Sequence, residues 1–483
     1  MFRRISGKAV AWTTLFLLLN TSALGQPSFS DPNRYHPSAE EQASLRDGIK
    51  GLETAIASLE RRLREATATP AHEDLKADVG VYLKAGRWVT RFGEFFLQND
   101  VRNTLQVLAQ GLERARELEA GEHPWTSAEG SSIRGYVSRV DGSVQPYALI
   151  LPKGYKPDQP ARLDVVLHGR GATLTEASFI HAHDGKPAPA DQEGLVLHVF
   201  GRTNNAYRWA GETDVFEAIE AVQRRYPIDV NRIVLRGFSM GGAGAWHIGL
   251  HHPSLWCSVE AGAGFTETKA YIKRNSFPPH EEHGLHIYDA VDYAANAFNL
   301  PMAGYGGEVD PQLQASRNIV EALEHLGYTM DRQGLITRAK GIEFLQKVGA
   351  GMGHKVDPAS ALFLKQFHDQ HAEKGRDTNP SALRFVTCTL KYNRAAWLTV
   401  EALDAHYERA TVNGAVTNGE FKVDAQNVRV LAIDPRVAKS VRFADDVFSL
   451  QSEGGGPALF VRTGARWKPL AGADARAFLQ NTE

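Results

Sequence analysis

A serine at the centre of a glycine-rich pentapeptide is the strongest chemical signal in the sequence. Ser239 lies in Gly237-Phe238-Ser239-Met240-Gly241, between the β-branched run 232–235 and the helix-like stretch 243–251. A serine in a sharp turn between strand and helix exposes its hydroxyl, and glycines two positions to either side avoid backbone collisions. The pattern predicts a nucleophilic serine. A glycine-rich loop with a bystander serine is the alternative.

Two further motifs accompany this serine. His168-Gly169-Arg170-Gly171 follows the apolar run 163–167, and a late Gly-x-x-Asp precedes a Gly-His pair. On these motifs, residues 131–375 resemble the α/β-hydrolase superfamily, in particular prolyl-oligopeptidase-like (peptidase S9-type) catalytic domains and secreted esterases of the feruloyl-esterase or polyhydroxyalkanoate-depolymerase type. The resemblance implies a triad in the chain order serine, acid, histidine.

The acid is expected at the end of a strand. Residues 300–306 have the pattern of a strand that leads into Asp310, at the sheet edge where ligand-facing residues gather. Glu308 is the second choice, and Asp289 and Asp292 are weaker ones. A turn-forming role before Pro311 is the structural alternative.

The general base must follow this acid in the chain. His325, His368 and His371 lie in helix-like stretches, whereas His354 alone follows a flexible glycine-containing loop. The resemblance places the base in a loop after the last strand. His354 is therefore predicted to take the serine proton, and Asp310 to hold its tautomer and stabilise the imidazolium.

The remaining candidates would bind substrate. The backbone N–H of Met240, which follows the nucleophile, is one expected oxyanion donor. The second is the N–H of Arg170 or of Gly171, between which the sequence does not choose. Arg202, Tyr207 and Trp209 come from the loop 201–209, whose aromatic and polar mixture suits a substrate wall, and surface packing is the alternative.

The chain divides into three patterns that must position these groups. Residues 36–122 predict a helical module, with a capping box at Ser38 and Glu41 and an apolar seam starting at Leu45. For this module, docking against the rest of the protein is favoured over a dimerising coiled coil.

Residues 131–375 alternate strands and helices, which indicates an α/β domain with a mostly parallel sheet covered on both faces. Residues 380–483 show short strands separated by turns, typical of an all-β sandwich, for which interdomain packing is favoured over carbohydrate binding.

Composition and the N-terminus limit the classes of function. The net charge of −2 offers no basic excess for nucleic acid. The sequence has only two cysteines, Cys257 and Cys388, which excludes a disulfide framework. Two buried free thiols are favoured over a bridge between them. His181-Ala182-His183-Asp184 is a weak metal signal, so no metal or organic cofactor is expected. A basic start, a short apolar run and a small-x-small site predict a signal peptide over residues 1–25, hence a secreted or periplasmic protein without stable membrane insertion.

Together these observations predict an exported serine hydrolase that acts on carboxylic esters or short peptides through an acyl-enzyme. The substrate would be a small-molecule or glycan-linked acyl ester, or a short peptide. The N-terminal region is too small for the propeller of large oligopeptidases, which favours an esterase. The alternative is a non-catalytic glycan- or envelope-binding protein with a decayed hydrolase domain.

Overall fold

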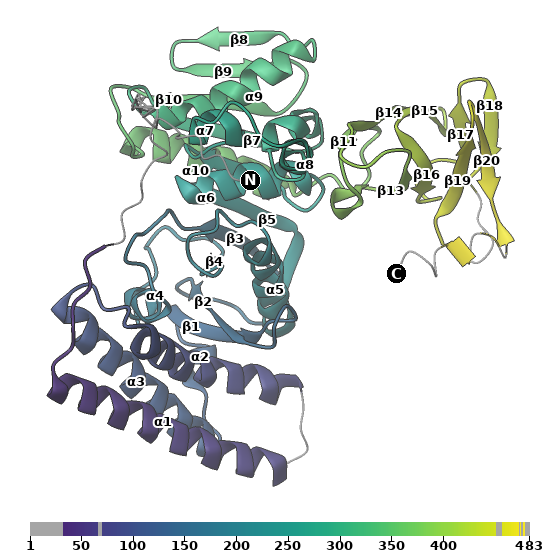
Figure 1. The fold of residues 1–483 in the computed structure, drawn as a ribbon. Coiled ribbons are helices and arrows are strands. Elements are labelled where there is room, and N and C mark those ends of the chain that lie inside the picture. Colours follow the sequence, from purple (N-terminus) through teal and green to yellow (C-terminus); the bar gives the residue numbers. More distant parts are fainter. Residues whose placement is uncertain (1–31, 66–69, 451–455, 473, 475–476, 479–483) are drawn as a thin grey trace, which may run out of the picture.

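Helices, an α/β domain and a β domain follow one another along the chain (Figure 1). The computed structural model describes residues 32–65, 70–450, 456–472, 474 and 477–478. The predicted signal peptide, residues 1–25, lies outside these residues. Among the helices that the structure describes, none has the length and apolar character to cross a membrane.

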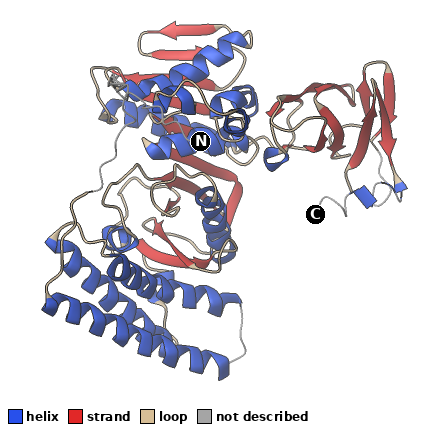
Figure 2. Ribbon diagram, in the orientation of Figure 1, coloured by secondary structure: helices blue, strands red, loops and turns tan. Residues whose placement is uncertain are grey.

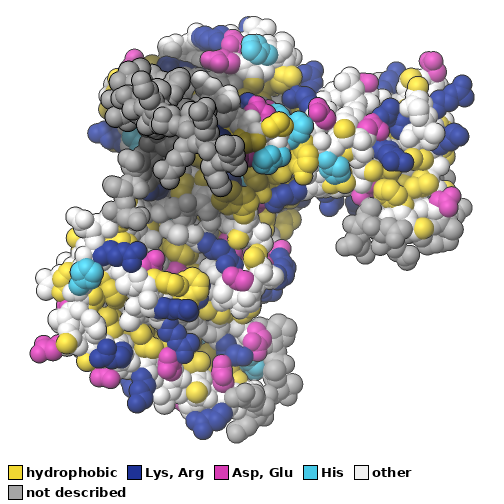
Figure 3. Space-filling model, in the orientation of Figure 1, with side chains coloured by type: hydrophobic (Ala, Val, Ile, Leu, Met, Phe, Trp, Pro, Cys, Tyr) yellow, Lys and Arg dark blue, Asp and Glu magenta, His cyan; other side chains and the backbone are white. Residues whose placement is uncertain are grey.

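The helical module consists of α1 (Ala39–Glu65), α2 (Pro70–Phe92) and α3 (Gln98–Glu119), as predicted. The Ser38–Glu41 capping box is present, with the Ser38 N–H donating to the Glu41 carboxylate over 2.7 Å. The seam residues Leu45, Leu52 and Leu59 are buried with side chains from α2 and α3. These seam leucines are covered within the chain, so they do not supply a coiled-coil surface for a second copy. Basic and acidic side chains are interspersed over this module (Figure 3).

The α/β domain is built on one ten-stranded sheet, in the order β1-β2-β4-β3-β5-β6-β7-β10-β9-β8. Neighbouring strands from β4 to β10 are parallel, whereas β1, β2 and the β8–β9 hairpin at the other edge pair antiparallel. The strands are β1 (Gly130–Val137), β2 (Val144–Leu151), β3 (Ala161–Leu167), β4 (Leu195–Val199), β5 (Ile228–Phe238), β6 (Ser258–Gly262), β7 (Met302–Gly307), β8 (Met330–Gln333), β9 (Ile336–Ala339) and β10 (Phe344–Gly349).

Helices cover both faces of this sheet (Figure 2). They are α4 (Glu176–His183), α5 (Ala210–Arg225), α6 (Met240–His251), α7 (Thr268–Ile272), α8 (Pro279–Leu285), α9 (Gln314–His325) and α10 (Pro358–Lys374). Successive side chains of a strand point to opposite faces. On β5, Leu235 joins the large core that contains Trp246 of α6, whereas Val234 packs on Ala372 of α10. This arrangement is an α/β-hydrolase fold, as predicted.

The β domain is a pair of five-stranded sheets, in the orders β11-β14-β15-β17-β18 and β12-β13-β16-β19-β20. One hydrophobic core joins the two sheets, which confirms the predicted sandwich. The strands are β11 (Ala382–Thr387), β12 (Arg394–Ala395), β13 (Leu398–Leu403), β14 (Ala410–Thr417), β15 (Glu420–Gln426), β16 (Val428–Ile433), β17 (Ser440–Phe443), β18 (Asp446–Ser449), β19 (Ala458–Thr463) and β20 (Arg466–Leu470).

Buried hydrogen bonds hold the β domain against the hydrolase domain. Asn296, in the 3₁₀ segment η2 (Ala290–Asn299), accepts the N–H of Val386 on β11 over 2.8 Å and donates to its carbonyl over 3.0 Å. The carboxylate of Glu212 on α5 accepts from Lys391 and Tyr392 in η4 (Leu390–Tyr392). The domain therefore has an interdomain packing role. Cys257 and Cys388 are buried free thiols, as favoured from the sequence.

Candidate active site

The turn around Ser239 joins β5 directly to α6 at the carboxyl edge of the sheet. Ser239 has φ +61° and ψ −123°. Residues other than glycine rarely adopt a backbone conformation with positive φ. A Cβ on Gly237 would lie 2.0 Å from the carbonyl oxygen of Gly241, and one on Gly241 would lie 2.0 Å from that of Leu167. Both glycines are therefore required by backbone that passes too close for a side chain. The sequence context of a nucleophile elbow corresponds to this geometry.

Three predicted residues, distant in the sequence, form a continuous hydrogen-bonded chain. The Oγ of Ser239 lies 2.8 Å from Nε2 of His354, and Nδ1 of His354 lies 2.8 Å from Oδ2 of Asp310. Asp310 is 5% exposed, whereas the His354 side chain is 42% exposed. The acid is thus shielded from water while the imidazole and hydroxyl remain reachable by a substrate. In this arrangement the histidine can take the serine proton while the buried carboxylate stabilises the charge that results.

The loop that carries the histidine is fixed at three points. The Tyr305 hydroxyl on β7 donates to the carbonyl of Lys355, next to His354, over 2.9 Å. The carboxylate of Glu308 accepts from the N–H of Gly351 over 2.8 Å, and Val309 N–H donates to the Met352 carbonyl over 3.0 Å. Glu308, the second choice for the acid, therefore positions the loop. No local motif marks Tyr305 or Glu308 for this role, and the sequence analysis did not assign it to them.

The weaker candidates for the acid bond elsewhere. Asp289 accepts from the N–H of Thr268 over 3.1 Å, and Asp292 bonds His286 over 2.7 Å. Among the described residues, neither carboxylate is hydrogen-bonded to Ser239, His354 or Asp310.

A second serine–histidine–acid chain lies inside the hydrolase domain. Ser258 Oγ is 2.8 Å from Nδ1 of His368, whose Nε2 is 3.0 Å from Oε2 of Glu260. Although burial alone raises the pKa of Glu260, the hydrogen bond with His368 and the charge of Arg236 hold it below its ordinary value. Ser258 and His368 are completely buried, so no substrate reaches this serine. Ser239 differs from Ser258 in its strained backbone at the elbow and in the solvent exposure of its histidine partner.

The predicted oxyanion donors border the nucleophile. Met240 is the first residue of α6, where a helix leaves its N–H without an intrahelical acceptor. Gly169 lies against the serine, because a Cβ there would be 3.5 Å from the Cβ of Ser239. The N–H of Gly171 already donates to Oδ1 of Asn204 over 3.1 Å. That bond favours Arg170 over Gly171 as the second donor, and both donor roles remain predictions.

The structure does not place Arg202 and Tyr207 in a substrate wall. Arg202 bonds the carboxylates of Asp141 and Asp214, which hold its loop to the neighbouring turn. Burial raises the pKa of Asp214 to about 6, although Arg202 acts against this rise. Tyr207 is completely buried, and its hydroxyl accepts the N–H of His168 over 2.7 Å. Tyr207 thus helps to hold the glycine-rich turn 168–171 in place. Trp209 is 61% exposed and remains available for contact.

A pocket of about 620 Å³ adjoins the serine between the loop after β6 and the start of α9. Gly264, which lines it, would place a Cβ 2.6 Å from the carbonyl oxygen of Ser239, and Pro311 directly follows the acid. Phe265 and Tyr271 line the same pocket and stack with ring centroids 4.2 Å apart. The sequence analysis did not single out this aromatic pair.

The weak metal motif is used for packing. Asp184 accepts hydrogen bonds from Tyr82 of α2 over 2.6 Å and from Arg114 of α3 over 2.9 Å. Within the described residues, no group of three or more His, Cys, Asp or Glu side chains is arranged to hold a metal ion. The carboxylate of this motif therefore ties the helical module to the hydrolase domain.

Comparison with known proteins finds no matching family model and no matching curated protein. Solved structures do match about half of the chain. A ferulic acid esterase is 16% identical over 51% of this chain and 100% of its own, with a TM-score of 0.36. S-formylglutathione hydrolase (FrmB) from Staphylococcus aureus is 14% identical over 51% of this chain and 100% of its own, with a TM-score of 0.37.

A peptidase is also among the similar structures. A putative dipeptidyl aminopeptidase IV from Bacteroides ovatus is 13% identical over 53% of this chain and 37% of its own, with a TM-score of 0.37. These likenesses are to an esterase, an S-formylglutathione hydrolase and a putative peptidase, all at low identity. They are too distant to transfer a substrate or an activity to this chain.

Proposed function

We propose that this chain is a serine hydrolase that transfers an acyl group from a carboxylic ester to water. The Oγ of Ser239 attacks the carbonyl carbon while Nε2 of His354 takes its proton. The tetrahedral oxyanion lies against the N–H groups of Met240 and Arg170. His354 then returns the proton to the departing alcohol, which leaves an acyl-Ser239. Water, deprotonated by the same imidazole, attacks the acyl carbon and releases the carboxylic acid and the free serine.

The single observation that carries this proposal is the hydrogen-bonded chain from Ser239 through His354 to Asp310 at an elbow. Both links are 2.8 Å long, within the range required for proton transfer. The buried Ser258–His368–Glu260 chain indicates that such bonding alone is insufficient. Solvent access to the histidine and the strained serine backbone supply the additional support.

Two features favour an ester over a peptide. The N-terminal module consists of helices that contact β1 and β2, at the opposite end of the sheet from β10, rather than a propeller over the site. The adjoining pocket offers the stacked rings of Phe265 and Tyr271 to an apolar acyl or alcohol group. Small-molecule or glycan-linked esters are thus the proposed substrates. Export from the cell is proposed on the sequence of residues 1–25.

Labelling with a fluorophosphonate tests the proposal against a non-catalytic binding protein. The wild-type protein should form a covalent adduct that mass spectrometry locates on Ser239, and Ser239→Ala should form none. Ser258→Ala is the matched control, since that serine has the same partners in a buried setting and its loss should leave labelling unchanged. Absence of an adduct on folded wild-type protein would reject the hydrolase proposal.

Parallel assays then separate the substrates. Short p-nitrophenyl esters and feruloyl esters should be hydrolysed by the wild-type protein, whereas peptide p-nitroanilides should turn over more slowly. Ser239→Ala should abolish ester hydrolysis while the melting temperature stays within a few degrees. Faster cleavage of the peptides than of every ester would replace the esterase proposal by a peptidase.

A further inference from the structure

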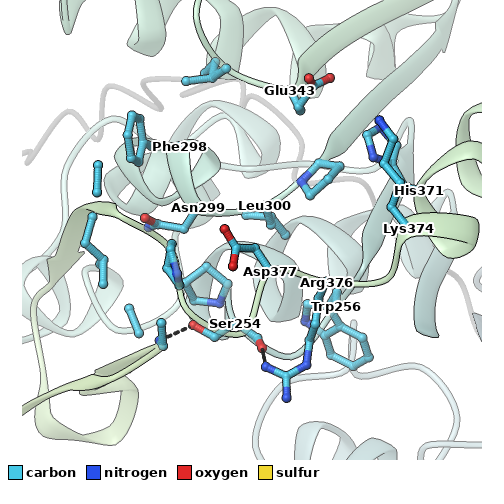
Figure 4. Close-up of a pocket in the computed structure, with 18 of the residues that line it drawn as sticks. Ser254, Trp256, Phe298, Asn299, Leu300, Glu343, His371, Lys374, Arg376 and Asp377 are labelled. Carbon is cyan, nitrogen blue, oxygen red and sulfur yellow. Dashed lines mark hydrogen bonds between the residues drawn. The ribbon is translucent and has the colours of Figure 1, made fainter. Parts of the chain in front are cut away.

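The edge of the sheet opposite the elbow carries two pockets where the β domain meets the hydrolase domain. One of about 630 Å³ is lined by Leu300, Glu343 and other residues just before β7 and β10 (Figure 4). The elbow residues follow the carboxyl ends of parallel strands, so these pockets lie at the amino ends. The larger pocket mixes Asp377 and Glu343 with Lys374 and Arg376, and its charges are balanced in sign.

The neighbouring pocket, of about 500 Å³, has a different character. Arg376 comes from the segment after α10, Arg394 is on β12, and Arg436 follows β16; all three line it. Among the described residues, no acidic side chain lines this pocket. It shares Ser254 and Arg376 with the larger pocket. Both domains therefore contribute positive charge to one concave space, and such interfaces are favoured places for ligands.

The guanidinium of Arg376 is incompletely satisfied. One of its terminal nitrogens donates to the carbonyl of Ser254 over 2.8 Å, as Figure 4 shows. Its Nε is buried and has no hydrogen-bond partner among the described residues. A buried donor without an acceptor costs free energy unless a ligand or water supplies one. Burial, and after it the positive charge of Arg394, lower the pKa of Arg376.

The other two arginines differ in their partners. Arg436 bonds Asp434 with its Nε at 2.9 Å and a terminal nitrogen at 2.5 Å. Arg394 makes no side-chain hydrogen bond or ion pair with another described residue, although the carboxylates of Asp434 and Glu401 lie near enough to feel its charge. His252, at the pocket wall, is 3.0 Å from Glu212. The lining thus keeps an excess of positive charge.

We propose that this pocket, lined by Arg376, Arg394 and Arg436, binds a small oxyanion. A phosphate, sulfate or carboxylate group there pairs with the planar guanidinium of Arg394, a geometry for which arginine is suited, and the positive charges of Arg376 and Arg436 attract it as well. The anion contacts residues from both domains and so strengthens their attachment. The two sources of this chemistry are a free inorganic ion and the carboxylate of an acidic sugar. This site is separate from the hydrolase chemistry and does not depend on it.

Calorimetric titration of the full chain tests the site. Sodium phosphate, sodium sulfate and sodium galacturonate are added to separate samples, each against sodium chloride of equal ionic strength. At least one oxyanion should bind saturably to the wild-type protein and raise its melting temperature. Tighter binding of phosphate or sulfate identifies the free ion as the source, and tighter binding of galacturonate identifies an acidic sugar.

Variants show whether binding occurs at this pocket. Arg394→Gln changes an exposed side chain, and it should weaken binding about ten- to hundredfold. Arg376→Gln should do the same. Arg429→Gln, which removes an exposed arginine of the same domain outside the pocket, should leave affinity unchanged. Equal affinity of Arg394→Gln and wild type, or no saturable binding of any of the three anions, would overturn the proposal.

Discussion

Substitution of Gly241 by alanine is the most direct perturbation of the elbow. The new Cβ would lie 2.0 Å from the carbonyl oxygen of Leu167, 2.7 Å from its carbonyl carbon and 2.9 Å from the carbonyl oxygen of His168. Real Cβ atoms keep at least about 3 Å from such atoms. The obstacles are backbone atoms of β3 and the following turn, so they cannot turn aside as a flexible side chain does. The start of α6 must therefore move by about 1 Å.

This shift affects stability and rate differently. Overpacking costs about 1–3 kcal/mol, and contact with backbone belongs at the upper end of that range. Alanine regains at most about 1 kcal/mol through its helix propensity, so a net loss of about 2 kcal/mol is expected. For a domain of this size, that loss lowers the melting temperature by about 4–8 °C. A 1 Å displacement of the serine should reduce kcat/KM for p-nitrophenyl acetate about 100-fold.

Gly51→Ala is the matched control for this experiment. Gly51 is in α1, and a Cβ there meets nothing within 4 Å. The melting temperature should stay the same or rise by a few degrees, with kcat/KM unchanged. Wild-type activity and melting temperature in Gly241→Ala would refute the reasoning, because the elbow would then tolerate a side chain that the geometry excludes.

Four further outcomes are expected. Asp310→Asn should lower kcat about 10³- to 10⁴-fold with little change in melting temperature, since the amide presents a donor to His354 and favours the wrong tautomer. Tyr207→Phe leaves the half-buried N–H of His168 without its acceptor and should lower kcat as well as the melting temperature; a purely structural role would lower only the melting temperature. Burial raises the pKa of Cys257 to about 11 and that of Cys388 to about 12. Neither thiol should therefore react with Ellman's reagent at pH 8 in the folded protein, and both should react after unfolding. Because the folded thiols keep protons that the unfolded ones lose near pH 9, the free energy of unfolding should fall as pH rises from about 9 to 11. Asn296→Ala removes the buried bonds to Val386 and should split or lower the calorimetric transition by weakening attachment of the β domain, whereas an unchanged transition would contradict this role.

Local signals in the sequence predicted the fold, and they selected three side chains that the structure joins by hydrogen bonds, because each signal depends on a short pattern. The glycines at 237 and 241 mark backbone crowding that only a strand–turn–helix junction creates. The strand before Asp310 and the glycine-containing loop before His354 restricted the choice by topology. The apolar period of the N-terminal helices predicted their buried faces for the same reason.

Contacts between distant segments could not be predicted in this way. Nothing near Tyr207 in the sequence shows that its hydroxyl accepts the amide of His168, since that bond depends on how two loops cross. The buried chain through His368 likewise arises only when α10 packs on β6. In the sequence, Arg202 has no evident partner, because Asp214 lies in the following helix and Asp141 in the turn between β1 and β2. Charged loop residues can be assigned to substrate only after such partners are known.

Side chains of the loop that contains Arg202 can affect the site at Ser239 without contacting a substrate. Five residues in this loop other than glycine have positive φ: Arg202, Thr203, Ala206, Tyr207 and Trp209. At about 1–2 kcal/mol each, such a backbone persists only if its surroundings hold it. The ion pairs of Arg202 hold one end, and the buried hydroxyl of Tyr207 holds the other. Between them, Asn204 donates to the carbonyl of Gly171 over 2.8 Å and accepts its N–H over 3.1 Å. The strained loop thus fixes the glycine-rich turn at two points, which would keep the proposed oxyanion donor of that turn in place.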